Sequence, residues 1–315
     1  MLVRIVPGVA YRVVRDERAR TRLGAGRDGL LAPEAVARSV DAAVGFLRAV
    51  RGWGSVDGLA IATAAVRDAA NAGELLDQLR AEAEIDVEVL SAEEEARLGA
   101  LAARASLQLR EATVVDLGGC SLQISRLSDG EPVAVGSVPL GALRMTEGFL
   151  AHDPPTEAEL AELRQAARAL VSDLLPRRTR PDEPLVGIGG TARALARLRT
   201  WGPLQAPPSP PDARRVAMDR ARSSSQRRRV TREDLVALRI RLSGLPLADR
   251  GHFPGLKPSR ADVIVAGAVV LEELLDLGDY PGLLVAEHGV RHGVLLRETF
   301  GPDSSRPMGI ERVVT

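Results

Sequence analysis

The most informative stretch of the chain reads Val114-Val115-Asp116-Leu117-Gly118-Gly119-Cys120-Ser121, and the β-prone run Leu122-Gln123-Ile124-Ser125 follows directly. An aspartate near the end of one strand, followed by a glycine-rich turn into the next, lets backbone N–H groups converge on an oxyanion, because no Cβ atom blocks the approach. The aspartate would act there through a metal ion or a water. The stretch predicts a hairpin that binds phosphate at its turn. A plain Gly-Gly hairpin is the competing interpretation.

The segments on either side of this hairpin predict an α/β fold. Three strands, a helix, a strand and a helix are expected in the first half, and a similar order follows in the second. The expected strands are Leu2–Val6, Val9–Arg15, a third ending near Leu23, Leu59–Thr63, Ile85–Leu90, Ala112–Leu117, Leu122–Leu127, Pro132–Val138, Leu185–Ile188 and Leu283–Val285. The expected helices begin at Pro33, Gly73, Ala92, Thr156 and Thr191, and another is capped by Ser259–Asp262 and ends near Leu275.

This repeated order predicts two related α/β domains, residues 1–110 and 111–315, that face one another across a cleft. One stretch fits neither core: residues 203–230 are rich in proline, serine and arginine. We interpret them as a flexible insertion, with a contact to a phosphate polymer or nucleic acid as the alternative.

Composition excludes several classes of protein. The 315 residues hold 42 Lys+Arg and 42 Asp+Glu, so the basic excess typical of nucleic-acid or anionic-membrane binders is missing. The single cysteine, Cys120, excludes a disulfide framework. No apolar run reaches the roughly 18 residues that a spanning helix needs, and no signal peptide is recognisable. We therefore expect a soluble, cytoplasmic protein with neither a membrane nor a nucleic acid as partner.

Three further patterns indicate a phosphate site. Gly189, Gly190 and Thr191 follow the strand at residues 185–188, with Thr191 as the expected N-cap, and helix N-termini bind anions. Arg67 follows a strand end, where a guanidinium suits bidentate phosphate contact. Glu95 lies in the first turn of its helix and could serve as a general base toward water. Each also has an ordinary structural interpretation: a strand–helix turn, a surface arginine and a favourable helix-end charge.

Two histidines are further candidates for metal ligands. His288 and His292 have i,i+4 spacing, but the glycines beside them, Gly289 and Gly293, argue against a stiff ligand helix.

Together these patterns resemble the Ppx/GppA phosphatase family, which contains exopolyphosphatases and guanosine pentaphosphate phosphatases. The resemblance covers almost the whole chain, from residue 22 to residue 291. The segments that carry it are 22–26, 62–69, 90–98, 116–121, 137–141, 187–191, 258–264 and 289–291.

The resemblance implies an actin-like, two-domain fold of ribonuclease-H-type halves with the phosphate chain in the interdomain cleft. It implies that Glu95 activates water and Arg67 contacts phosphate, both as catalytic residues. Asp116 would be a metal ligand, Gly118, Gly119 and Ser121 would form a phosphate loop, and Gly189, Gly190 and Thr191 would make a further glycine segment. It also implies a divalent metal, usually Mg²⁺, a polyphosphate or phosphorylated guanosine nucleotide as partner, and a homodimer.

The sequence departs from the family pattern in two places. Members begin with a strand and an Asp-x-Gly-(Ser/Thr)-Asn-Ser loop, whereas Val3–Val6 resembles the strand after that loop. Either the gene start is misassigned, or Leu2–Val6 takes the place of that central strand. Without it we expect a split sheet with exposed apolar neighbours. In the second loop, Cys120, Leu122 and Gln123 replace the usual Gly, Thr and Glu.

These departures leave three hypotheses for function. The leading one is a phosphoanhydride hydrolase in which metal-assisted water attack removes the terminal phosphate. The second is a degenerate family member that binds phosphorylated ligand without hydrolysing it. The third is a phosphotransferase of the same actin-like class.

Overall fold

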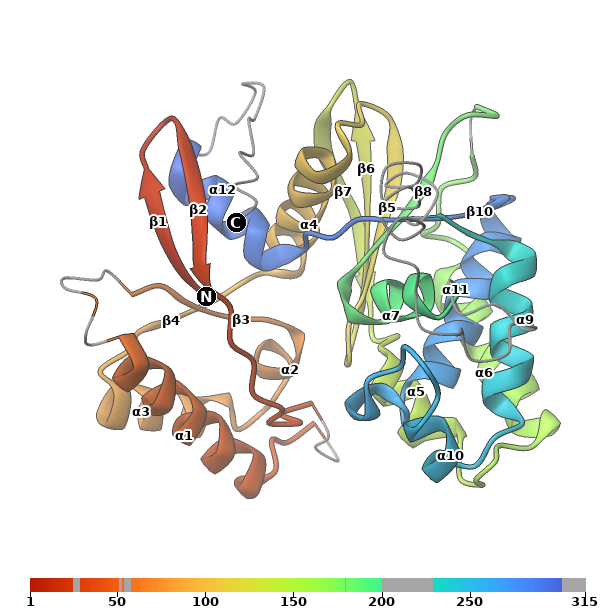
Figure 1. Cartoon of the computed structure of the whole chain (residues 1–315), viewed down its shortest axis with the longest axis horizontal. Helices are drawn as coiled ribbons and strands as arrows, with labels where there is room; N and C mark the ends of the chain where they lie inside the picture. The colour runs from red at the N-terminus through yellow and green to blue at the C-terminus, as the bar shows by residue number, and fades with distance from the viewer. Residues whose placement is uncertain (25–28, 51–52, 54–57, 179, 200–228, 302–315) are drawn as a thin grey trace, which may run out of the picture.

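The computed structural model describes residues 1–24, 29–50, 53, 58–178, 180–199 and 229–301 (Figure 1). The strands are β1 Leu2–Val6, β2 Ala10–Arg15, β3 Ala60–Ala62, β4 Val87–Val89, β5 Ala112–Leu117, β6 Leu122–Ser128, β7 Glu131–Val138, β8 Leu185–Ile188, β9 Arg229–Thr231 and β10 Gly282–Val285. The helices are α1 Pro33–Val50, α2 Ala64–Arg67, α3 Ala72–Ala83, α4 Ala92–Leu107, α5 Ala142–Phe149, α6 Glu157–Val171, α7 Gly189–Arg199, α9 Arg232–Ser243, α10 Leu247–Gly251, α11 Ile264–Gly278 and α12 Val290–Phe300, with a 3-10 turn at Pro258–Arg260.

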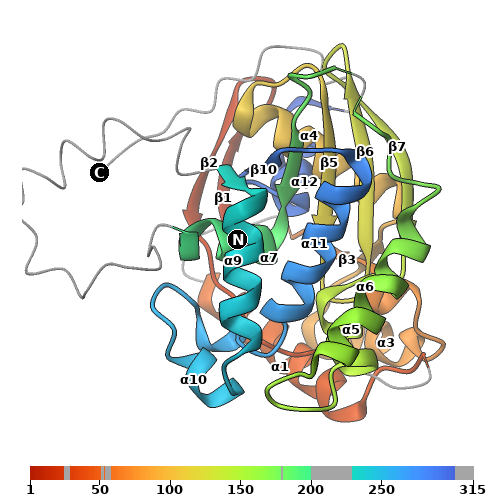
Figure 2. The same ribbon diagram turned by 90° about the vertical axis from the view of Figure 1, so that its right-hand side faces the viewer.

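A six-stranded sheet forms the centre of the C-terminal half, in the order β7-β6-β5-β8-β10-β9. β8 pairs in parallel with β5 and with β10, whereas β6, β7 and β9 are antiparallel to their neighbours. Helices cover both faces, which is why β8 is buried along its whole length. α4 packs on β6 and β7, while α11 packs against α5, α6, α7 and α9 on the other face, as Figure 2 shows.

The N-terminal half has its strands in two separate pairs. β1 and β2 form an antiparallel hairpin, and β3 and β4 form a parallel pair. The expected split sheet is thus confirmed, and Val6, Val13 and Val89 are among its exposed apolar side chains. The alternative that Leu2–Val6 takes the place of a central strand is wrong, because among the described strands it pairs only with β2.

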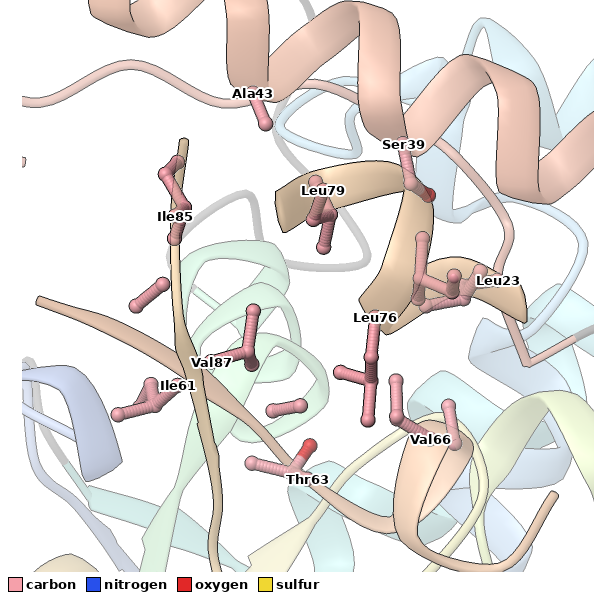
Figure 3. A pocket seen from close by; sticks show the side chains of 14 residues that line it. Leu23, Ser39, Ala43, Ile61, Thr63, Val66, Leu76, Leu79, Ile85 and Val87 are labelled. Carbon is pink, nitrogen blue, oxygen red and sulfur yellow. The ribbon is translucent and has the colours of Figure 1, made fainter. Parts of the chain in front are cut away.

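An apolar cavity of about 420 Å³ lies beside β3, between the short parallel pair and helices α1 and α3 (Figure 3). Among the described residues that line it, only Ser39 and Thr63 carry polar side-chain groups and none is charged, so the cavity is poorly suited to a phosphate. The lining residues are Leu23, Ser39, Ala43, Ala60, Ile61, Ala62, Thr63, Ala65, Val66, Leu75, Leu76, Leu79, Ile85 and Val87. The predicted phosphate site therefore has to lie elsewhere.

Several predicted elements need correction. The strand expected to end near Leu23 is not formed; residues 16–22 run outside any sheet and make ion pairs with the C-terminal half. Helices α2, α5, α9 and α10 were not predicted from the sequence. Ser259–Asp262 does not cap α11, because the 3-10 turn ends at Arg260 and the helix begins at Ile264.

The capping boxes differ in how complete they are. At α6 the box is complete, because the Thr156 hydroxyl and the Glu159 carboxylate each accept the other residue's backbone N–H. At α4 the Ser91 hydroxyl accepts from the Glu94 N–H, but the Glu94 carboxylate accepts from Arg97 instead of returning to the cap. Glu94 therefore stabilises the helix through a side-chain ion pair.

The division into residues 1–110 and 111–315 stays a prediction. Two helices pack against elements from the other side of it. α4 lies before residue 110 but packs on β6 and β7, and α12 comes last yet packs on α4 and β2 (Figure 1). Most of the predicted insertion at residues 203–230 lies outside the described residues. Its end is structured, since Arg229 and Val230 belong to β9, which pairs with β10. None of the described helices combines the length and apolar character needed to span a membrane.

Candidate functional site

Two glycine turns lie side by side at one edge of the six-stranded sheet. β5 and β8 are parallel, with Asp116 opposite Ile188, so the turns that follow the two strands meet at the carboxyl ends, where ligands gather in α/β sheets. Gly189 begins α7 with φ +87°, and a Cβ there would lie 2.6 Å from Asp116 Oδ1. Only glycine satisfies both the left-handed backbone and this close approach. The structure thus brings Asp116 against the second glycine segment.

Backbone hydrogen bonds from the start of α5 hold the first glycine turn in place. The N–H of Ala142 donates to Gly118 O at 2.9 Å, and the N–H groups of Leu143 and Arg144 donate to Gly119 O. Gly118 N–H itself donates to Ser121 O at 3.0 Å, so Gly118 shapes the turn and has no N–H left for a ligand. In the described part of the chain, the N–H groups of Gly119 and Cys120 have no acceptor. These two groups can donate to a phosphate oxygen.

Ser121 points into the protein at the start of β6. It is 5% exposed, and its hydroxyl accepts a hydrogen bond of 2.6 Å from Gln123 Nε2, which also reaches Ser137 Oγ at 3.3 Å. A glutamate at position 123 could not donate in this way when ionised. Gln123 therefore fixes the orientation of the Ser121 hydroxyl, a role that was not predicted from the sequence.

Arg67 and Glu95 form a largely buried ion pair. Arg67 ends α2, Glu95 lies in the first turn of α4, and Nη1 of the arginine is 2.9 Å from Oε2 of the glutamate. The same Nη1 donates to Leu90 O at 2.9 Å, which fixes the guanidinium. The two side chains are 18% and 8% exposed, respectively. Residues 28 positions apart in the sequence are thus in direct contact, with Glu95 turned inward.

The negative charge of Glu95 affects the protonation of Asp116. Burial raises the pKa of Glu95, and the hydrogen bond and charge of Arg67 act against that increase. Burial, and then the negative charge of Glu95, raise the pKa of Asp116 to about 7, with the Arg193 guanidinium acting in the opposite direction. Although Asp116 is partly exposed as a residue, its carboxyl group is enclosed by the turn at Gly189. Neighbouring carboxylates of this kind favour a cation between or beside them.

The donor set fits Mg²⁺ better than a transition metal. No group of three or more His, Cys, Asp or Glu side chains arranged to hold a metal occurs among the described residues. Mg²⁺ is commonly bound through one or two carboxylates, with water and substrate phosphates supplying the other oxygens. Asp116, at the turn between the two glycine segments, can supply such a carboxylate oxygen.

The second glycine segment differs from the sequence-based expectation. Thr191 is not the N-cap of α7, because the helix begins at Gly189 and Thr191 lies in its first turn. Thr191 is 1% exposed, its hydroxyl has no hydrogen-bond partner in the described structure, and its methyl group packs against Gly267. A Cβ at Gly190 would lie 2.0 Å from Arg260 Nη2. Gly190 therefore makes room for a guanidinium that the sequence analysis did not assign to the site.

The histidine pair does not have the geometry of metal ligands. The rings of His288 and His292 are stacked, with centroids 4.2 Å apart and an interplanar angle of 16°. Lone pairs in nearly parallel ring planes cannot converge on one ion. Burial, and then the charge of His288, lower the pKa of His292 to about 3, so His292 is neutral at neutral pH.

Replacing Asp116 by Asn should stabilise the metal-free protein at high pH. The folded-state pKa of Asp116, about 7, exceeds its ordinary value of 3.8. The folded state therefore binds more protons between those values, and its stability falls as the pH rises through them. Asn does not titrate, so at about pH 8 the variant should be more stable by about 4 kcal/mol. Urea unfolding with EDTA across the pH range measures this difference. A gain that stays constant with pH would contradict the assignment.

Similarity to known proteins extends over almost the whole chain. A profile of the Ppx/GppA phosphatase family matches residues 1–300. The chain is 33% identical over 305 residues to exopolyphosphatase 2 of Mycobacterium tuberculosis, covering 92% of this chain and 90% of that protein. It is 32% identical over 249 residues to exopolyphosphatase 1 of the same species, covering 78% and 68% of the two chains.

Two solved structures share the fold. The Ppx-GppA enzyme of Aquifex aeolicus has a TM-score of 0.69 and 26% identity, with 91% of each chain covered. An exopolyphosphatase of Cytophaga hutchinsonii has a TM-score of 0.76 at 22% identity, with 91% of this chain and 89% of that one covered. These likenesses confirm the predicted actin-like α/β fold.

Proposed function

The chain belongs to the Ppx/GppA phosphatase family, and from this premise we propose that it hydrolyses polyphosphate by removing the terminal phosphate. The observation that carries the proposal is the buried pair of Arg67 and Glu95 beside Asp116 and the two glycine turns. Similar relatives carry the name exopolyphosphatase, which supports linear polyphosphate as the first substrate to test.

In the proposed mechanism Glu95 acts as the general base. Its carboxylate takes a proton from a water, which attacks the terminal phosphorus while the bond to the bridging oxygen breaks and the shortened polyphosphate leaves. The raised pKa of Glu95 brings its basicity closer to neutral pH. Glu95 is largely buried, and Arg67 holds one of its carboxylate oxygens. Both features restrict the orientation of the carboxylate.

The remaining groups stabilise charge on the nonbridging oxygens. Arg67 and the free N–H groups of Gly119 and Cys120 donate to them. Asp116 would hold Mg²⁺, which supplies charge neutralisation for the phosphates when bound. Burial and the Glu95 charge raise the pKa of Asp116, and a cation beside the carboxylate would offset both effects. This supports Asp116 as the residue that holds the metal.

Phosphate release from long-chain polyphosphate, with Mg²⁺ and then with EDTA, tests the proposed function. We expect Mg²⁺-dependent release of inorganic phosphate. Thermal stabilisation by polyphosphate without release would instead identify a family member that binds but does not hydrolyse. Guanosine pentaphosphate is the second substrate for the same assay, and phosphate transfer to ADP would reveal a phosphotransferase.

A further inference from the structure

Three buried polar side chains alternate along β6 on the face of the sheet that α4 covers. Ser121, Gln123 and Ser125 lie two positions apart, so they point to the same side of the strand. Each is at most 5% exposed, and Ser125 Oγ donates to Ala96 O at 2.8 Å. Ala96 follows Glu95 in α4, so this polar row faces the part of the helix that carries the proposed base.

Gln123 is the member of this row that lies directly opposite Asp116. The two residues are Cα partners in the antiparallel pair of β5 and β6. Residues paired in this way point to the same face, with Cβ atoms about 4.5–5.5 Å apart. A glutamate at position 123 would therefore place a second carboxylate beside that of Asp116, which suits a divalent cation. Gln123 places a neutral amide there instead.

Hydrogen bonds to two serines hold this amide in place. Nε2 donates to Ser121 Oγ at 2.6 Å and to Ser137 Oγ at 3.3 Å, and Ser137 is the residue opposite Gln123 on β7. An amide NH2 group donates hydrogen bonds and offers a cation no lone pair. Gln123 therefore contributes hydrogen bonds within the sheet, and no negative charge, at the position beside Asp116.

The other carboxylates near the site already share a guanidinium group. Arg67 Nη1 lies 2.9 Å from Glu95 Oε2, and Arg67 Nε lies 3.3 Å from Asp68 Oδ1. A metal ion beside either carboxylate would be repelled by the charge of Arg67. Asp116 forms no ion pair with a described residue. In the part of the chain that the structure describes, the site thus offers a metal ion one carboxylate that is not already paired.

We propose that Gln123 keeps the free protein from binding Mg²⁺ on its own, so that the ion enters the site only together with polyphosphate. The proposal rests on the proposed function for that substrate. With one available carboxylate, most of the oxygens around the ion have to come from water and from phosphates, a common arrangement for Mg²⁺ in phosphate-transferring sites. A linear polyphosphate presents several phosphate oxygens at once and so supplies the ligands that the protein lacks.

Binding of Mn²⁺ to the protein without polyphosphate tests the proposal. Mn²⁺ prefers the same oxygen ligands as Mg²⁺, and the EPR signal of the unbound ion gives its free concentration. The wild-type protein should bind Mn²⁺ with a Kd of about 1 mM or weaker. Gln123→Glu adds a carboxylate beside Asp116 and should lower this Kd about tenfold or more. Wild-type binding as tight as that of the variant would overturn the proposal.

Thermal unfolding gives a second readout for the same variant. In EDTA, Gln123→Glu places a further negative charge in a buried position, so its Tm should lie below that of the wild-type protein. Mn²⁺ should raise the Tm of the variant by mass action and leave that of the wild-type protein unchanged. A folded variant whose Tm does not respond to Mn²⁺ would refute the proposal. If the variant does not fold with or without Mn²⁺, the wild-type Kd alone decides.

Two control variants separate the added carboxylate from other effects. Gln123→Met removes the hydrogen bonds to the serines without adding charge, and it should bind Mn²⁺ as weakly as the wild-type protein. Gln165→Glu adds the same charge at an exposed position of α6, on the other face of the sheet, and should leave the Kd unchanged. A gain in affinity in either control would show that the carboxylate beside Asp116 is not its cause.

A measurement with a phosphate chain tests whether the ion enters with it. The probe is an imido analogue of tripolyphosphate, whose P–N–P bridges resist hydrolysis. Relaxation of water protons by Mn²⁺ is enhanced when the ion is held on a large, slowly tumbling molecule. The wild-type protein should give this enhancement with Mn²⁺ and the analogue together, but not with Mn²⁺ alone, and Asp116→Asn should lose it. No enhancement with the analogue would overturn the proposal.

These readouts also distinguish the proposal from the proposed function, because none of them requires turnover. Weak binding of Mn²⁺ alone, with enhancement by the analogue, supports the role of Gln123 even if the wild-type protein releases no phosphate. Tight binding of Mn²⁺ by the free protein refutes that role even if the protein is an active hydrolase.

Discussion

Glu95→Gln should reduce kcat for phosphate release from polyphosphate by about a hundredfold to ten-thousandfold, the usual effect of removing a general base. The amide has the same shape and can still accept from Arg67 Nη1, so the affinity for polyphosphate should change little. Initial-rate kinetics with Mg²⁺ give kcat, and anisotropy of labelled polyphosphate gives the affinity. Turnover that stays close to the wild-type rate would reject Glu95 as the base.

Glu94→Gln is the matched control for this experiment. Glu94 is the preceding residue, but it is more exposed and pairs with Arg97 and Arg297 instead of Arg67. Its replacement should leave kcat unchanged and cost at most about 1 kcal/mol of stability. A similar loss of kcat in both variants would show that the effect comes from the first turn of α4 as a whole.

Arg67→Met should destabilise the fold and abolish activity together. It leaves the carboxylate of Glu95, 8% exposed, without its cation, and breaking a buried pair in this way costs about 3 kcal/mol or more. Burial already raises the pKa of Glu95, and loss of Arg67 removes a group that lowers it. The folded state then binds an additional proton, so the penalty should grow as the pH rises and diminish as it falls toward the unfolded-state pKa.

The double variant Arg67→Met with Glu95→Gln distinguishes the lost ion pair from lost packing. With no buried charge left, it should recover a large part of the stability and lose its dependence on pH, as a double-mutant cycle measured by urea unfolding can show. It should remain inactive. If the double variant loses as much stability as the two single variants combined, the two side chains are not coupled.

Much of the fold could be predicted because its signals are local. The turn at residues 118–121 between two β-prone runs gave β5 and β6, and the Thr156–Glu159 pair gave the start of α6, as the structure confirms. The split of the N-terminal sheet was also predictable, since a sheet that lacks a central strand has no partner for its neighbours.

The parts of the site that escaped prediction depend on long-range contacts. Arg260 reaches the site because Gly190, 70 positions earlier, leaves space for its guanidinium, and no local pattern reveals such a contact. Thr191 was expected to cap α7, but the helix already begins at Gly189, which has φ +87°, so Thr191 lies in the first turn and its side chain is buried. The family resemblance implied roles for Arg67 and Glu95 separately, but their direct contact was not predicted, since periodicity cannot bring two helix ends together.

The position of α12 has a consequence for how the protein is made. This helix packs on α4 so closely that a Cβ at Gly293 would lie 2.1 Å from Leu98 O, less than one helical turn after Glu95. A nascent chain emerges from the ribosome with residues 92–107 long before residues 290–300. During translation the face of α4 that α12 covers therefore stays exposed, and the protein acquires its final arrangement only when about 300 of its 315 residues have been synthesised.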